Sequence, residues 1–556
     1  MIVARIRWVA VFLLVQALAF LSPELSKGQT SSSTALTGRV SSPEEGRMEG
    51  VLVSAKGEGS SLTITVVSDS QGRYSFPRGR LEPGQYSLRI RAVGYDLDGP
   101  GRVAIPAEKT AQADLRLRRT QDLASLLTNA EWLLSAPGTR EQKTELLECV
   151  SCHTLERSFR SRYNKDELIK VVQRMGTYAA GTTPERPQIT PNRPEGGRDR
   201  IPAEAIEYLS TVNLSDVPQW RFPLKTLPRP KGKATRVVIT EYDLPRPHAM
   251  PHDAIVDSKG AVWYSDFGEQ YLGRLDPKSG KVVEYDVPVF RSGMPTGFRV
   301  VEFDPEGTIW LSMSGQGAVG RFDPATRKFQ TWNVPKGLNG ASGVMPRYSN
   351  VDGKVWILAG GMVQRLDVKT GEWERETINV FRDLPKNLPV ATRPQSIYDI
   401  FSDSKNNLYV SVFRSEYIGR LDARTKKVSF YETPTFDSGP RRARFDNQDR
   451  LWFAEYRGNK IAMFDTKTER IREWEIPSPF SGPYEVVLDK GGYAWAGGMM
   501  TDRVARLHTQ TGEIVEYMLP RSTNIRRVDV DNSANPPTFW VGNNHGASLI
   551  KVEPLE

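Results

Sequence analysis

The sequence contains very few residues of the kinds that cross-link chains or hold structural metal ions. Among 556 residues there are only two cysteines and five histidines. A structural zinc site takes four ligands of these kinds at close spacing. The two cysteines are Cys149 and Cys152, and the first histidine after His153 is His248. This spacing excludes a zinc finger, and the cysteine count leaves room for one disulfide at most.

Long apolar runs and blocks of one charge are also scarce. The apolar run 8–21 follows Arg5 and Arg7 and precedes a polar stretch with small residues, so we expect residues 1–28 to be a secretory signal peptide. The run is shorter than the ~20 residues of a spanning helix, and no later segment is long and apolar enough. The alternative is an uncleaved anchor. The net charge of +9 is scattered along the chain, which argues against nucleic-acid binding and leaves acidic partners or a membrane surface.

Both cysteines lie in one motif, Cys149-Val150-Ser151-Cys152-His153. This arrangement is typical of covalent haem c attachment, with each thiol bound to a haem vinyl group and His153 as an axial iron ligand. The alternative is a simple Cys149–Cys152 disulfide. Haem attachment together with an export signal predicts a periplasmic or extracellular protein. The cofactor predicted by the motif is one covalent haem c.

The segment 34–119 consists of short alternating strands separated by turns, which predicts a β-sandwich of about seven strands. Its motifs, such as Thr37-Gly-Arg-Val and Asp69-Ser-Gln-Gly-Arg-Tyr-Ser-Phe, resemble those of the carboxypeptidase regulatory-like domain. The resemblance implies a module that anchors or spaces other domains. We interpret Asp69 to Gly72 as a turn between strands, with part of a calcium loop as the alternative.

The segment 120–217 changes to helical patterning, with helices expected at 121–135, 139–148, 166–178 and 203–212. Helices around the cysteine motif, a long loop and a closing helix resemble a small class I-like cytochrome c. Met175 is the one methionine between His153 and His248, so it is the default second axial ligand. It departs from the family, whose ligand methionine comes later. The alternative is a core methionine with the sixth iron position open or filled by another side chain.

The rest of the chain is an internal repeat, preceded by a linker at 218–231. Aromatic strand residues that follow an Asp-turn recur every 43 to 53 residues, from Trp263 to Trp540. Four-stranded blades need ~40–50 residues, so we predict a seven-bladed β-propeller over 232–556. The strand 237–245 supplies the outer strand that the last copy lacks and closes the ring. The predicted fold is therefore mainly β and multidomain: a β-sandwich, a small helical domain and a propeller.

The repeats resemble the streptogramin (virginiamycin B) lyase family of propellers. In that family a histidine after Gly-Pro and a glutamate after Trp-Phe-x serve acid–base elimination. Here the two groups are split between blades: His252 stands with Asp266 in one, and Glu455 stands alone in another. Arg441 occupies the histidine position beside Glu455, and arginine does not exchange protons near neutral pH. Retained lyase activity would require His252, Asp266 and Glu455, and Mg²⁺ would enter only with that activity.

The residues at the starts of the inner strands should line one mouth of the propeller channel. Several arginines among them suggest an anionic small molecule or an acidic partner surface; a solvated rim of structural ion pairs is the alternative. The expected rim residues are Arg299, Arg347, Arg441, Tyr484, Arg526 and His545.

Taken together, the motifs predict an exported c-type haem protein for electron transfer, with a propeller that binds a substrate or a redox partner protein. The alternative is a propeller enzyme. That enzyme would be either a lyase-like C–O eliminase or a dehydrogenase that passes electrons to the haem.

Overall fold

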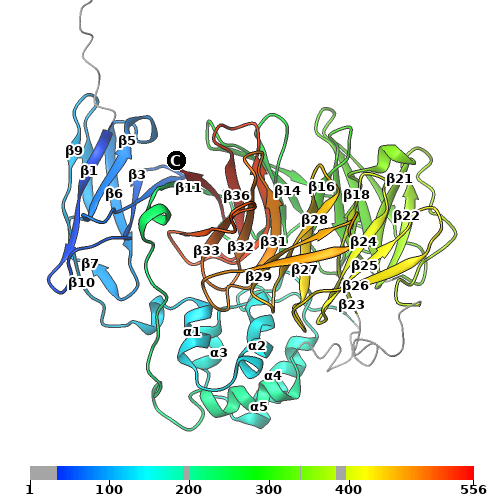
Figure 1. The fold of residues 1–556 in the computed structure, drawn as a ribbon, viewed down its shortest axis with the longest axis horizontal. Coiled ribbons are helices and arrows are strands. Elements are labelled where there is room, and N and C mark those ends of the chain that lie inside the picture. The colour runs from blue at the N-terminus through cyan, green and yellow to red at the C-terminus, as the bar shows by residue number, and fades with distance from the viewer. Residues whose placement is uncertain (1–33, 192–200, 339, 383–395, 556) are drawn as a thin grey trace, which may run out of the picture.

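The computed structural model describes residues 34–191, 201–338, 340–382 and 396–555 (Figure 1). The predicted signal segment 1–28 lies outside these residues. The chain is mainly β, as predicted: a β domain, a small helical domain and a ring of seven blades follow each other. Within the described ranges, no helix is long and apolar enough to cross a membrane.

The β domain has two sheets around one core that contains Leu36, Val53, Phe76 and Leu115. It has ten short strands rather than about seven, several of them only two or three residues long, such as β2, β7 and β9. One sheet has the order β2-β1-β10-β7, with β5 and β9 also on β1, and the other runs β4-β3-β6-β8. The elements are β1 (Thr34–Ser42), β2 (Gly46–Arg47), β3 (Leu52–Gly57), β4 (Leu62–Val67), β5 (Arg73–Pro77), η1 (Arg78–Arg80), β6 (Gly84–Arg91), β7 (Tyr95–Leu97), β8 (Arg102–Ile105), β9 (Ala111–Gln112) and β10 (Leu115–Arg119).

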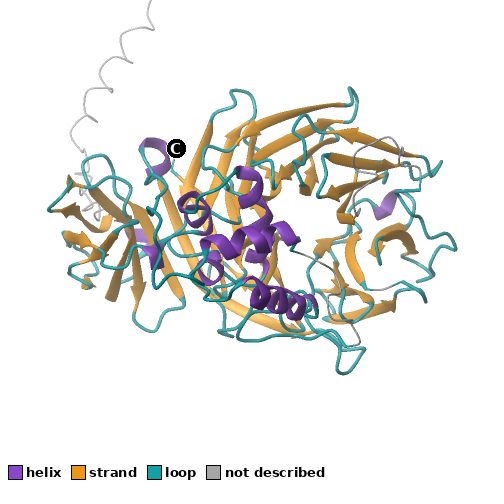
Figure 2. Ribbon diagram, turned by 90° about the horizontal axis from the view of Figure 1, so that it is seen from below, coloured by secondary structure: helices purple, strands orange, loops and turns teal. Residues whose placement is uncertain are grey.

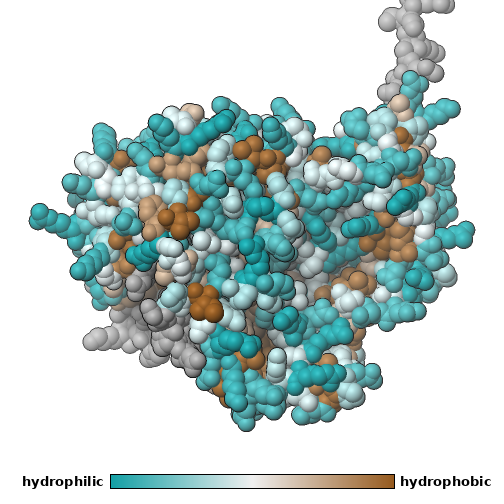
Figure 3. All heavy atoms as spheres, turned by 180° about the vertical axis from the view of Figure 1, so that it is seen from behind, coloured by the Kyte–Doolittle hydropathy of each residue, from teal (hydrophilic) through white to brown (hydrophobic). Residues whose placement is uncertain are grey.

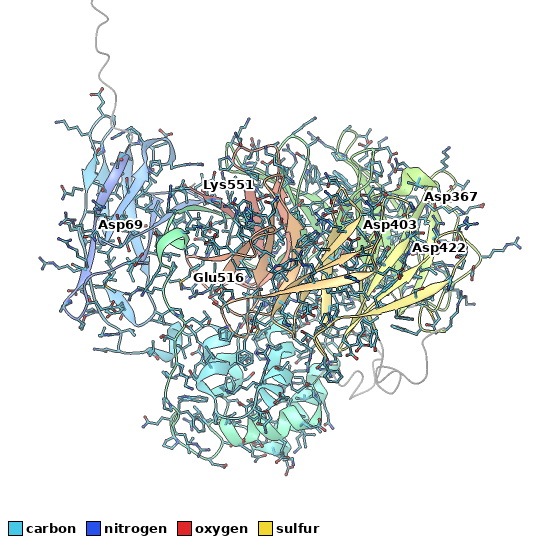
Figure 4. The ribbon with its side chains drawn as sticks, viewed as in Figure 1. Asp69, Asp367, Asp403, Asp422, Glu516 and Lys551 are labelled. Carbon is cyan, nitrogen blue, oxygen red and sulfur yellow. The ribbon has the colours of Figure 1, made fainter. Side chains whose placement is uncertain are left out.

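Asp69 closes a turn between β4 and β5 (Figure 4). Its Oδ1 accepts hydrogen bonds from the backbone N–H groups of Gln71 at 2.8 Å and Arg73 at 2.9 Å. The carboxylate thus caps its own loop, as an Asx-turn does. This is the role expected from the sequence.

The helical domain lies below the propeller in Figure 1. The closing helix spans the predicted residues, whereas the segment around the cysteine motif is a 3₁₀ helix instead of a continuous α-helix. The elements are η2 (Ala124–Leu126), α1 (Asn129–Ser135), α2 (Arg140–Thr144), η3 (Glu145–Ser151), α3 (Leu155–Phe159), α4 (Lys165–Gly176), α5 (Ala203–Val212) and, in the following linker, η4 (Gly232–Thr235).

Six of the seven propeller blades are antiparallel sheets whose strands follow each other in sequence, and the seventh takes β11 from the start of the propeller. The third blade has three named strands and two isolated bridges that extend it to Trp373 and Ile378. The first blade contains β12 (Pro251–Val256), β13 (Val262–Asp266), β14 (Tyr271–Asp276) and β15 (Lys281–Asp286). The second contains β16 (Val301–Phe303), β17 (Ile309–Met313), β18 (Ala318–Asp323) and β19 (Lys328–Asn333). The third contains β20 (Ala341–Met345), β21 (Lys354–Ala359) and β22 (Met362–Asp367), with η5 (Ser349–Val351) between β20 and β21. The later blades are β23 (Ser396–Ser402), β24 (Leu408–Phe413), β25 (Tyr417–Leu421) and β26 (Val428–Glu432); β27 (Pro440–Phe445), β28 (Arg450–Glu455), β29 (Lys460–Asp465) and β30 (Arg470–Glu475); β31 (Pro483–Leu488), β32 (Tyr493–Gly498), β33 (Arg503–His508) and β34 (Ile514–Met518); and β35 (Ile525–Asp531), β36 (Thr538–Asn543) and β37 (Ser548–Pro554) with β11 (Val237–Asp243).

In four blades the repeated Asp-turn and the tryptophan after it form one hydrogen-bonded unit. Trp263 Nε1 donates to Asp257 Oδ2 at 2.9 Å, and Trp495 Nε1 donates to Asp489 Oδ2 at 2.8 Å. The indole buries its large apolar surface between blades while its N–H is satisfied by the turn. Where tyrosine replaces tryptophan, Asp403 binds the Asn407 amide instead (Figure 4). This pairing explains why the two residue types recur at fixed spacing.

The ring closes through β11, which pairs antiparallel with β37 along its whole length, as the sequence predicts. The other edge of β11 pairs with β4 of the β domain, from Val238↔Val66 to Tyr242↔Leu62. One eight-stranded sheet therefore runs from the last blade into the β domain. Alternate β11 side chains serve the two bodies: Val238 belongs to the β-domain core and Ile239 to the core of the last blade. The β domain is thus joined to the propeller by a continuous sheet and not only by a flexible linker.

The helices lie against one face of the propeller, next to the β domain, when the molecule is seen from below (Figure 2). The view from behind, relative to Figure 1, shows a mostly hydrophilic surface with small, separate hydrophobic patches (Figure 3). The core of the helical domain extends into the propeller, since it includes Tyr456, Tyr484, Met499 and Met500. This shared core fixes the cysteine motif at the mouth of the propeller channel.

Candidate functional site

The cysteine motif sits on the end of η3 and is held there by the propeller. The backbone oxygen of Val150 accepts a hydrogen bond from Asn524 Nδ2 at 3.0 Å, and that of Ser151 accepts one from Arg526 at 3.0 Å. Cys149 is buried, with 5% of its surface exposed, whereas Cys152 is half-buried. The two are not joined by a disulfide. Burial raises the pKa of Cys149 to about 12.

The His153 ring has one nitrogen engaged and one available. Nδ1 lies 2.9 Å from the backbone oxygen of Thr154. A carbonyl oxygen can only accept, so Nδ1 carries the proton and Nε2 of the neutral ring keeps its lone pair. Burial lowers the pKa of His153, which favours this neutral form. A ring oriented in this way by a backbone carbonyl is prepared to bind a metal through Nε2.

Cys152 and His153 line a cavity of about 670 Å³ between the helical domain and the propeller. This volume falls within the range of about 300–1,000 Å³ that is typical of cofactor sites. The far walls are the propeller segments 247–250 and 268–269, together with Asn544 and His545. The exposed Arg157 also borders the space and offers a guanidinium group to an anion.

The loop 181–188 forms another wall of the cavity and is fastened to the propeller. Gln188 donates from Nε2 to the Gly268 carbonyl at 2.9 Å and accepts from the Thr296 N–H at 2.8 Å. Gly181 has φ +80°, and a Cβ there would lie 2.0 Å from the backbone oxygen of Phe267. Only glycine permits this approach, so the loop and the first blade form one continuous wall.

The predicted rim residues Arg441 and Arg526 point to the helical domain. Arg441 lies 3.1 Å from Glu148 and stacks 3.5 Å above the ring centroid of Tyr456. Nearby, Arg457 forms an ion pair with Glu145 at 2.5 Å. The acidic surface that these arginines meet therefore belongs to the same chain, on η3. The arginines dock the helical domain over the channel.

The other rim arginines have different surroundings. Arg299 donates to the Ser342 carbonyl and faces the Tyr398 ring. The sequence suggested that Arg347 begins an inner strand, which is wrong. The inner strand of the third blade is β20, and Arg347 follows its end. It forms an ion pair with Glu302 at 3.1 Å. The irregular glycine-rich start of this blade is the reason for the error.

His252 is part of a closed hydrogen-bond chain in the channel. Its Nδ1–H donates to Asp253 Oδ1 at 2.7 Å, and its Nε2 lies 3.2 Å from the Tyr484 hydroxyl. Tyr484 accepts in turn from Tyr398 at 2.6 Å. Burial lowers the pKa of His252 to about 3. Although burial alone would raise the pKa of Asp253, the neighbouring arginines, Arg442 foremost, hold it below its ordinary value.

Asp266 and Glu455 have other partners. Asp266 forms an ion pair with Arg246 and accepts from the N–H groups of Gly268 at 2.9 Å and Glu269 at 3.0 Å. Burial, and then the neighbouring Glu473 carboxyl, raise the pKa of Glu455 to about 9. Of the contacts among the described residues, none joins His252, Asp266 and Glu455 into one site.

Met175 and His545 differ in their position relative to the cavity that His153 lines. Met175 lies in the last turn of α4, which packs on α5, and it does not line the cavity that His153 lines. His545 does, with an exposed side chain that faces this space.

Two further residues, His248 and Met250, line the cavity, and the sequence analysis did not identify them as site residues. The available signal was the run Pro247-His-Ala-Met250 between β11 and β12, where a histidine and a methionine stand two residues apart in a turn.

Two segments of the chain are similar to known protein families. A model of the virginiamycin B lyase family matches residues 385–553, and a model of the carboxypeptidase regulatory-like domain matches residues 35–118. A search of curated proteins found no match. The propeller is thus virginiamycin B lyase-like and the first domain is carboxypeptidase regulatory-like. The helical segment with the cysteine motif lies outside both matches.

Solved structures include similar chains. A streptogramin B lyase is 22% identical with a TM-score of 0.49, and the match covers 58% of this chain and all of that one. A virginiamycin B lyase from Staphylococcus aureus is 21% identical with a TM-score of 0.47, over 57% of this chain and 99% of that one.

Proposed function

We propose that this chain is an exported c-type haem protein that transfers electrons, with the haem in the cavity between the helical domain and the propeller. The observation that carries the proposal is the arrangement of His153: its Nδ1 is engaged by the Thr154 carbonyl and its ring lines a cavity of cofactor size. The motif that precedes it supplies two thiols at the spacing of thioether attachment.

The residues present fit this group. Haem iron takes four ligands from its porphyrin, so the protein needs to add only one or two. Cys149 and Cys152 would hold the haem covalently and His153 would bind the iron through Nε2. Arg157 would face the haem carboxylates. Bound haem supplies one-electron redox chemistry, and the propeller wall limits the access of water to it.

The two thiols differ in their position. Cys152 lines the cavity, while Cys149 lies in the core of the helical domain. Attachment at Cys149 therefore requires its thiol to turn from that core toward the cavity. Haem is attached more readily at Cys152 than at Cys149 if the folded arrangement guides the reaction.

Export is part of the proposal, because haem attachment to such motifs takes place on exported chains. Its support is the charged start, the apolar run and the small-residue zone within residues 1–28. We place the protein in the periplasm or outside the cell. The docking of Arg441 on Glu148 leaves the propeller mouth covered by the helical domain, so a redox partner would approach the haem from the cavity opening.

Expression of the full chain in a bacterial periplasm with haem c maturation proteins tests the proposal. We expect haem that stays with the polypeptide on a denaturing gel and titrates as a one-electron couple. The double variant Cys149→Ser/Cys152→Ser should lose it, and Cys152→Ser alone should lose more than Cys149→Ser. Ser151→Ala, within the same motif, is the matched control and should keep it. A folded, exported wild-type protein without covalent haem would overturn the proposal.

A further inference from the structure

His545 extends from the last blade into the same cavity as the cysteine motif. It lies in the turn between β36 and β37, and Cys152 and His153 line the space that its side chain faces. His153 and His545 border the same cavity. They are separated by nearly four hundred residues in sequence, and the docking of the helical domain brings them together.

The turn that carries His545 is joined to the cysteine motif through Asn524. The backbone N–H of Asn544 donates to the Asn524 carbonyl at 3.3 Å, and Asn524 Nδ2 donates to the backbone oxygen of Val150 at 3.0 Å. His545 is exposed toward the cavity that Cys152 and His153 line. A neutral imidazole keeps a lone pair on one ring nitrogen and can bind a metal ion through it.

The other potential iron ligands on the cavity wall are less well prepared. Met250 is 6% exposed, and its sulfur packs against Gly268, where an added Cβ would lie 2.9 Å away. His248 is exposed in a proline-rich turn. Neither belongs to the turn that Asn524 joins to the cysteine motif, whereas His545 does.

We propose that His545 is the second axial ligand of the haem iron, on the side opposite His153. This inference rests on the proposed haem function. Its consequence is that the metal centre belongs to two domains: the helical domain attaches the haem and the propeller completes its coordination. Two imidazoles in place of imidazole and thioether give a lower reduction potential, because methionine ligation raises it.

The experiment uses the haem-loaded full chain and reads coordination instead of activity. Electron paramagnetic resonance of the oxidised protein should show a low-spin centre with two imidazoles, the near-infrared band of methionine ligation should be absent, and the reduced protein should bind carbon monoxide poorly. His545→Ala should convert the iron to a form that binds carbon monoxide readily. His545→Met should keep a low-spin iron, add the near-infrared band and raise the potential.

The controls are Met175→Leu, Met250→Leu and His248→Ala, none of which should change the spectra. The inference is overturned if haem is bound and His545→Ala leaves the wild-type spectrum unchanged, or if the wild type itself shows methionine ligation or high-spin iron. The wild-type spectra decide the matter even when a variant does not fold. Absence of covalent haem from the wild type is a different result, since it overturns the proposed function.

Discussion

The guanidinium group of Arg441 lies 3.1 Å from the carboxylate of Glu148, and this contact joins the propeller to the helical domain. Arg441 is 2% exposed and stands among aromatic rings, with Tyr456 at 3.5 Å. The contact lies one residue before Cys149, so the docking of the two domains and the position of the cysteine motif depend on the same ion pair.

Glu148→Gln should loosen this docking. Removal of one partner from a largely buried ion pair leaves the other charge without compensation, at a cost on the order of 3 kcal/mol. We expect a lower free energy of unfolding in urea and faster amide exchange in η3 and around Cys149. Glu141→Gln, on the exposed side of α2, is the matched control. Equal stability of the two variants would contradict the assigned role of the pair.

The continuous sheet predicts that the β domain and the propeller unfold together. Val238→Ala removes contacts from the β-domain core and Ile239→Ala removes them from the last blade, although the two residues are neighbours on β11. Ile239→Ala should cost about 2–5 kcal/mol, and Val238→Ala somewhat less. Calorimetry should show both variants lowering the midpoint of one shared transition. Two separate transitions, each sensitive to one variant, would show that the bodies are independent.

Glu455 predicts a loss of stability as the pH rises from about 4.5 to about 9. Burial raises the pKa of Glu455 to about 9 in the folded protein, while the unfolded chain has the ordinary value near 4.5. The folded state therefore holds the proton more tightly, and this group destabilises the fold progressively as pH rises through that interval. Glu455→Gln should flatten the dependence and gain at least about 1 kcal/mol at pH 9. Glu475→Gln, exposed on β30, should change little; the same pH profile in Glu455→Gln and wild type would refute this account.

The closed hydrogen-bond chain around His252 predicts that the propeller does not open cyclic-peptide lactones. Both ring nitrogens of His252 are engaged, by Asp253 and Tyr484, and the side chain is buried. We expect no cleavage above background with or without Mg²⁺, followed by chromatography of the substrate. Cleavage that His252→Ala and Glu455→Gln abolish would instead support the lyase alternative.

The sequence analysis succeeded where local patterning decides the structure. Repeated Asp-turns and tryptophans predicted the blades, because in four of them the turn and the indole form a unit within one blade. The closing helix, Ala203–Val212, was also predicted to the residue. The helix expected at 139–148 is partly a 3₁₀ helix, since the Leu147 and Val150 carbonyls bind Tyr456 and Asn524 instead of the next helical turn.

The cavity could not be predicted in the same way. It is formed by contacts between distant segments, such as Gln188 with Thr296 and Asn524 with Val150. Sequence spacing around His153 led to Met175, which is close in the chain and does not line the cavity. His545 was expected only at the propeller mouth, and nothing in the sequence indicated that the cysteine motif would be docked there.

The intact mass of the exported wild-type chain, matured with haem c attachment proteins and unfolded in acid, tests the central claim most directly. The account predicts the mass of the processed polypeptide plus one haem, and the loss of that increment in Cys149→Ser/Cys152→Ser. A folded wild-type chain with the mass of the polypeptide alone would contradict it.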